Sequence, residues 1–149
     1  GQEFPPSRLQ EVHVFRTSLP ENPLTIIGLN RDVFFGIKLR NLAKELGYDL
    51  TLVPTAERLE SDLETGSDHV ALIVIDMNLI AEPIAWDIVD RIIVRFPELP
   101  TLGFGSHTDV EIRRAAKSAG LTRIVSNGDF HKNAATLIQR YARIDPEAE

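Results

Sequence analysis

One carboxylate, Asp76, follows the most apolar stretch of the chain. Residues 70–75 are all hydrophobic, and four of the six are β-branched. An apolar run without alternation is typical of a strand that is covered on both faces, in the middle of a parallel sheet. Ligands of open α/β sheets bind at the carboxyl ends of the strands, so Asp76 is a candidate for chemistry. The alternative is that it caps a turn.

A second polar group, Asn30-Arg31-Asp32, follows another apolar run at residues 24–29. Asn30 or Asp32 could supply the N-cap of the helix that comes next. If the two apolar runs form neighbouring strands, this group meets Asp76 at the same edge of the sheet.

Several kinds of catalytic site are disfavoured because their motifs are missing. The first strand lacks the G-x-G-x-x-G run of a dinucleotide site, and the chain has no G-x-S-x-G elbow of an esterase-type hydrolase. It contains no cysteine, which excludes thiol catalysis and thiolate metal sites. Its four histidines do not fall at metal-ligand spacings on any predicted helix.

Size and charge fit one globular domain. The chain has 149 residues, 43% of them hydrophobic and 26% charged, with a formal net charge of −6. An acidic balance disfavours direct nucleic-acid binding. No apolar run approaches the roughly 20 residues of a membrane span, and the amino terminus lacks a signal-peptide pattern. We therefore expect a cytoplasmic protein without direct contact to membrane or nucleic acid.

Strand and helix patterns alternate along the chain. Strands are predicted at 24–29, 49–53, 70–76, 100–105 and 123–126, with helices over 35–46, 55–65, 84–96, from the capping box at 108–111 to Gly120, and 130–141. Five such units predict an α/β fold: a doubly wound five-stranded parallel sheet in the flavodoxin-like order 2-1-3-4-5, in three layers.

The predicted domain covers residues 23–145. Residues 1–22 are interpreted as an N-terminal extension, of which 1–4 are attributable to an expression vector, and 146–149 as a tail.

Three segments resemble the receiver domain of two-component response regulators, the CheY-like fold. They are residues 26–48 (with Arg-Asn-Leu-Ala-Lys-Glu-Leu-Gly-Tyr at 40–48), residues 72–78, and residues 100–120 (with Ala-Ala-Lys-Ser-Ala-Gly at 115–120). The resemblance extends over roughly residues 23–144. It implies that Asp76 occupies the position that accepts a phosphoryl group from a histidine kinase. Asn78 occupies the position whose backbone carbonyl binds Mg²⁺.

The chain departs from the family pattern at the other positions of the site. Asn30-Arg31 stands where the family has an acidic pair that holds the metal, with Asp32 one step late. Gly105 replaces the hydroxyl residue after the fourth strand and is followed by Ser106 and His107. Asn127-Gly128 replaces the Lys-Pro after the fifth strand, and Ile124 replaces the switch aromatic.

These departures indicate a pseudo-receiver, a signalling domain that works through protein contacts with phosphorylation lost or altered. Arg31, if it points into the cleft, would place a cation ~4 Å from Asp76, a pair that gains about 4 kcal/mol at an effective dielectric constant of ~20 before desolvation. Such a cation would replace the metal, so we expect no bound cofactor and no enzymatic activity.

Two alternatives stay open. In one, the domain is a functional phosphoacceptor in a phosphorelay, with Mg²⁺ held by Asp32, Asp76 and Asn78. In the other, a cleft around Asn30, Asp76, Ser106 and His107 binds a small ligand.

The resemblance also implies a surface for a protein partner or for self-association. The family pairs through its fifth strand and last helix, where Arg123, Arg140, Tyr141 and Arg143 are expected to lie. The alternative is that Tyr141 belongs to the apolar stripe and that the arginines are solvated.

Overall fold

Five strands and five helices alternate along the described part of the chain, as predicted. The structure, a computed structural model, describes residues 22–80 and 82–144. The strands are β1 (Thr25–Leu29), β2 (Asp49–Val53), β3 (Val70–Asp76), β4 (Thr101–Gly105) and β5 (Arg123–Ser126). The helices are α1 (Val33–Glu45), α2 (Ala56–Gly66), α3 (Pro83–Arg95), α4 (Val110–Ala119) and α5 (Asn127–Tyr141), with short 3₁₀ turns η1 (Ser67–His69) and η2 (Met77–Leu79).

The strands form one parallel sheet in the order β2-β1-β3-β4-β5. This is the predicted flavodoxin-like order, so the fold prediction is confirmed. In the register of the sheet, Leu29 of β1 lies beside Ile75 of β3. The residues that follow the two strands, Asn30 and Asp76, therefore emerge side by side at the carboxyl edge.

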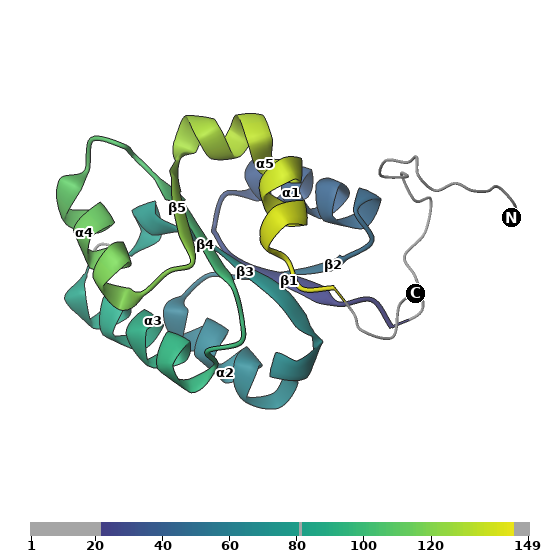
Figure 1. The fold of residues 1–149 in the computed structure, drawn as a ribbon, viewed down its shortest axis with the longest axis horizontal. Coiled ribbons are helices and arrows are strands. Elements are labelled where there is room, and N and C mark those ends of the chain that lie inside the picture. Colours follow the sequence, from purple (N-terminus) through teal and green to yellow (C-terminus); the bar gives the residue numbers. More distant parts are fainter. Residues whose placement is uncertain (1–21, 81, 145–149) are drawn as a thin grey trace, which may run out of the picture.

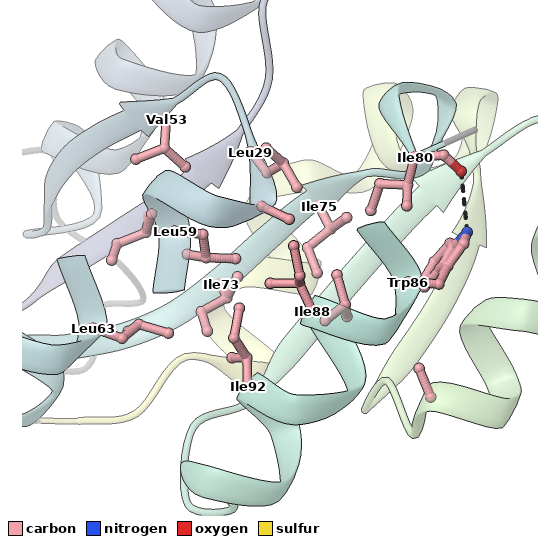
Figure 2. Close-up of a cluster of buried hydrophobic side chains, with 14 of the residues drawn as sticks. Leu29, Val53, Leu59, Leu63, Ile73, Ile75, Ile80, Trp86, Ile88 and Ile92 are labelled. Carbon is pink, nitrogen blue, oxygen red and sulfur yellow. Dashed lines mark hydrogen bonds between the residues drawn. The ribbon is translucent and has the colours of Figure 1, made fainter. Parts of the chain in front are cut away.

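Helices cover both faces of the sheet and make three layers (Figure 1). Helices α1 and α5 pack on one face, and α2, α3 and α4 on the other. The six apolar residues of β3 are all buried, with Ile73 and Ile75 facing α2 and α3 and with Leu72 and Val74 facing α1 and α5. Figure 2 shows the first of these two clusters. Burial on both faces explains why β3 is apolar without alternation.

The helix starts differ from the prediction by one to three residues, and α5 and α4 show the physical reason. Helix α5 begins at Asn127, directly after β5, whereas the predicted helix began at residue 130. Ser126 caps it by accepting a hydrogen bond from Asp129 N at 3.0 Å, and the helix is kinked at Asn133. The N-cap of α4 is Asp109, not Thr108, because the Asp109 side chain accepts from Ile112 N.

The chain that leaves α5 returns to the amino end of β3. Arg143 N donates to Ala71 O at 2.8 Å, and the Arg143 guanidinium donates to the carbonyl oxygens of Val70 and Ser67. Tyr48 Oη donates to Arg143 O at 3.3 Å, and burial raises the pKa of that phenol. These contacts fix the last described residues to the edge of the sheet opposite Asp76.

The predicted extension at residues 1–22 lies outside the described residues except for Asn22, and so does the predicted tail at 146–149. Within residues 22–80 and 82–144, no helix is both long and apolar enough to span a bilayer.

Candidate functional site

Both carboxylate oxygens of Asp76 accept hydrogen bonds from neutral amide groups. Asp76 Oδ2 accepts from Asn30 Nδ2 at 3.1 Å. Asp76 Oδ1 accepts from the Asn78 backbone N at 3.0 Å and from Asn78 Nδ2 at 2.8 Å. Asp76 also provides the N-cap of η2, so the turn-capping alternative is correct as part of its role. Hydrogen bonds to a charged acceptor contribute about 1.5–3 kcal/mol each.

Hydrogen bonds to Asp32 and Asp76 fix the orientation of the Asn30 side-chain amide. Its side chain is buried, 6% exposed. Its Oδ1 accepts from Asp32 N at 2.7 Å, which leaves Nδ2 as the end that faces Asp76. Asn30 N donates to Val53 O of β2 at 3.1 Å. The side chain at this position therefore offers a hydrogen-bond donor to Asp76, where a metal site would need an acceptor.

Asp32 is the N-cap of α1, one of the two candidates that the sequence offered. Its Oδ1 accepts from Phe34 N at 3.0 Å and from Phe35 N at 3.2 Å. These contacts satisfy two of the amide groups that a helix start leaves without partners. Asp32 thus stabilises the helix and makes no hydrogen bond to Asp76 or Asn78.

The expected ion pair between Arg31 and Asp76 is not formed. Arg31 is exposed. It forms no ion pair within 4.0 Å with any other described residue. The side chain of Asn30 turns toward β3 and takes the place beside Asp76, while the side chain of Arg31 lies in solvent. Among the described residues, the side chains of two asparagines and no basic side chain bind the carboxylate.

Asn127 and Gly105 complete the surroundings of Asp76. Asn78 Nδ2 lies 3.4 Å from Asn127 Oδ1, which links the site to the first residue of α5. A Cβ atom on Gly105 would lie 3.0 Å from Met77 Cε and 3.8 Å from Asn78 Oδ1. The sequence analysis missed the contact between Gly105 and Met77, which is fully buried. The only sequence signal for a role of Met77 is its position between Asp76 and Asn78.

Ser106 and His107 belong to the following turn. Ser106 Oγ is 2.8 Å from Thr108 Oγ1 and accepts from Thr108 N at 3.3 Å, while His107 is exposed. No hydrogen bond among the described residues joins Ser106 or His107 to Asp76. The small-ligand cleft stays a prediction.

The donors around Asp76 do not fit Mg²⁺. This ion prefers oxygen ligands in octahedral geometry, normally with one or two carboxylates. Here the one carboxylate faces two amide NH₂ groups, and Asp32 is engaged by α1. Among residues 22–80 and 82–144, no three His, Asp or Glu side chains are grouped in a way that could hold a metal ion.

The four residues predicted for a partner surface differ in their positions and hydrogen-bond partners. Arg123 NH1 donates to Tyr141 Oη at 3.1 Å, so β5 and α5 are joined at this surface. Arg140 is exposed on α5. Arg143 lies beyond the end of α5, and its guanidinium is bound to backbone carbonyls. The expectation that Arg143 lies on the last helix is therefore wrong.

Comparisons with known proteins identify the fold. No family model and no curated protein matches the chain. Solved structures that match include the receiver domain of an HD domain-containing protein from Pseudomonas fluorescens, at 18% identity and TM-score 0.63, covering 83% of this chain and 90% of that one. A response regulator from Thermotoga maritima matches at 11% identity and TM-score 0.66, over 80% and 97%. A protein described as related to pilus assembly, from Burkholderia pseudomallei, matches at 14% identity and TM-score 0.64, over 85% and 94%.

These likenesses place the chain in the α/β class with a flavodoxin-like sheet. More narrowly, the chain has the CheY-like fold of response-regulator receiver domains.

Proposed function

We propose that this chain is a pseudo-receiver, a signalling domain that acts through protein contacts and has lost phosphorylation at Asp76. The observation that carries the proposal is the occupation of both Asp76 oxygens by the amides of Asn30 and Asn78. A carboxylate nucleophile needs a free oxygen that can approach phosphorus in line, together with cations that take up the developing charge. Here both oxygens are bound, and the groups that bind them are neutral amides.

Three further positions support the proposal. Gly105 offers no hydroxyl and Asn127 no ammonium group, so the two side chains that the family uses to bind an attached phosphate are missing. Ile124 provides no switch aromatic that could report phosphorylation. A phosphoryl group on Asp76 would therefore meet few charge partners and would have no usual readout.

The fold by itself does not select a phosphotransfer function, since one fold hosts many functions. The matching Burkholderia protein is described by pilus assembly and not by phosphotransfer. We therefore rest the function on the site and propose a non-enzymatic role in signal transduction, in the cytoplasm, without bound cofactor.

The proposed partner surface includes Arg123, Arg140 and Tyr141. Arg123 and Tyr141 form a hydrogen-bonded pair across β5 and α5, and Arg140, which precedes Tyr141 in α5, adds an exposed cation. A protein partner or a second copy of the chain could dock there. Arg143 is omitted because its guanidinium is bound to Val70 and Ser67.

The test is incubation with acetyl phosphate and Mg²⁺, followed by intact-mass measurement. A receiver that is known to autophosphorylate serves as the positive control, and Asp76→Asn as the matched variant. We expect no phosphoryl adduct on the wild-type chain, and no shift of its unfolding temperature by beryllofluoride with Mg²⁺. An adduct that is lost in Asp76→Asn would show that the chain is a functional phosphoacceptor instead.

A further inference from the structure

A groove runs between α3 and α4, and its lining residues do not include Asp76 or the side chains that bind it. Its volume is about 430 Å³, within the range of about 300–1,000 Å³ that is typical of ligand sites. On each helix the lining positions recur every three or four residues over about two turns, so the groove follows the two helices lengthwise. The residues that matter for the argument are Ile80, Trp86, Asp87, Asp90, Glu111 and Ile112.

The floor of the groove is apolar and fixed. Trp86 is 9% exposed, and its indole N–H donates to Ile80 O at 3.0 Å (Figure 2). Ile112 of α4 packs against the same core cluster. The first turns of the two helices also leave Ile84 63% exposed and Val110 59% exposed, next in sequence to lining residues. An apolar segment laid along the groove would find partners for its own apolar side chains.

The walls of the groove are acidic. Among the ten lining residues in the described part of the chain, Asp87, Asp90 and Glu111 carry a charge and the other seven are uncharged. None of the three carboxylates is among the ion pairs formed within the described part of the chain. A concave surface with charge of one sign concentrates its potential and attracts the opposite charge.

The opposite side of α3 shows the contrast. There Arg91 and Arg95 neutralise the carboxylate of Glu60 on α2, with a bidentate pair at 2.7 Å from Arg91. Arg91 and Arg95 of α3 therefore form ion pairs with α2, whereas Asp87 and Asp90 line the groove on the α4 side. The three carboxylates of the groove, which form no ion pair within the described residues, are therefore open to basic side chains of a partner.

We propose that the α3–α4 groove docks a basic amphipathic segment of another protein. Its apolar side chains would lie on the floor near Trp86 and its lysines or arginines against Asp87, Asp90 and Glu111. An elongated groove between two helices suits a peptide segment. The proposal deepens the proposed function by naming the chemistry of one partner, and it rests on the domain acting through protein contacts.

The first experiment selects from a random peptide library displayed on phage, with the full chain as bait. We expect enrichment of peptides that combine lysine or arginine with leucine, isoleucine or aromatic residues. Enrichment of acidic or uncharged peptides, or no enrichment, overturns the proposal.

The second experiment titrates the most enriched peptide and follows the fluorescence of Trp86, the single tryptophan of the chain. The variant Asp87→Asn/Asp90→Asn should weaken binding about tenfold or more, since it removes charges that face the peptide. The matched control Glu57→Gln/Asp68→Asn removes two exposed acids outside the groove and should leave binding within about twofold. Equal binding by both double variants would place the peptide elsewhere and overturn the proposal.

Failure here can be told apart from failure of the proposed function. Groove variants leave Asp76 and its amide partners unchanged, so the acetyl phosphate test gives its answer whether or not a peptide binds.

Discussion

Gly105 and Met77 pack so closely that a Cβ atom on residue 105 would lie 3.0 Å from Met77 Cε and 3.3 Å from Met77 Cβ. Gly105 is not among the glycines with positive φ, so close packing and not backbone conformation favours a glycine here. The space where receivers place a hydroxyl side chain is filled by a fully buried methionine. The buried Met77 side chain thus occupies the space that a hydroxyl side chain at residue 105 would need.

The first prediction follows from this contact. Gly105→Ser should lower the free energy of unfolding by about 1–3 kcal/mol, because the added atoms overpack the site. In the double variant Met77→Ala/Gly105→Ser the added side chain occupies the space that the methionine leaves. The double variant should therefore lose at least about 1 kcal/mol less than the sum of the single losses. Urea unfolding of the four proteins measures this coupling, and strictly additive losses would contradict it.

Much of the fold was predictable because the signals were strong and local. The bounds of β2 and β5 were predicted as observed, and the apolar run before Asp76 placed β3 in the centre of the sheet. The start of α5 was missed, since Asn-Gly favours a turn when taken alone. Ser126 overrides that preference by capping Asp129 N, a contact that depends on where β5 ends.

The sequence predicted which residues lie near Asp76, but not which of them forms a hydrogen bond with it. Sheet order alone brings Asn30 beside Asp76, as expected. Which of Asn30 and Arg31 faces Asp76 depends on the direction of each side chain at the end of β1. A charge argument favours the arginine, whereas the geometry of the chain selects the asparagine.

The second prediction concerns Asn30→Asp. The new carboxylate would stand about 3 Å from Asp76 Oδ2, and like charges at this distance raise the pKa of one of the pair. A raised folded-state pKa makes the variant relatively stable at low pH, with stability lost as the pH rises through that pKa. We expect Asn30→Asp to be about 1–3 kcal/mol less stable than the wild type at pH 7 and to recover in millimolar Mg²⁺.

Asn30→Ala is the matched control for that experiment. It removes the hydrogen bond to Asp76, and also the one from Asp32 N, without adding charge. The loss of stability of Asn30→Ala between pH 4 and 8 should therefore change little with pH or Mg²⁺ beyond the response of the wild type. Thermal unfolding across pH 4–8, with and without Mg²⁺, distinguishes the two variants. If Asn30→Asp shows the flat behaviour expected of Asn30→Ala, the amide does not face Asp76 as described.

The third prediction separates a capping role of Asp32 from a metal-binding role. Asp32→Ala should cost about 1 kcal/mol of unfolding free energy, whereas Asp32→Asn should cost only a few tenths, since asparagine caps about as well as aspartate. Thr55→Ala, which removes the N-cap of α2, supplies a reference for the size of a capping loss. If Asp32→Asn abolished a Mg²⁺-dependent rise in stability of the wild type, the carboxylate would be a metal ligand instead.

The fourth prediction is a pH dependence that arises from Glu60. The hydrogen bond from Arg91, with further attraction from Arg91 and Arg95, holds the pKa of Glu60 below its ordinary value of 4.5. The folded state therefore binds a proton less readily than the unfolded state, so this stabilisation is complete above about pH 4.5 and is lost as the pH falls through the lowered pKa. Glu60→Gln should be less stable than the wild type at neutral pH, and the difference should shrink on acidification.

Urea unfolding of the wild type and Glu60→Gln between about pH 6 and pH 3 measures that difference. Arg91→Gln removes the bidentate partner and should reproduce most of the effect of Glu60→Gln. Both arginines are partly exposed, at 52% and 42% for Arg91 and Arg95, so the contribution is a surface one and should weaken in about 1 M salt. A difference between Glu60→Gln and the wild type that is constant with pH would mean that the ion pair between α2 and α3 does not form in solution.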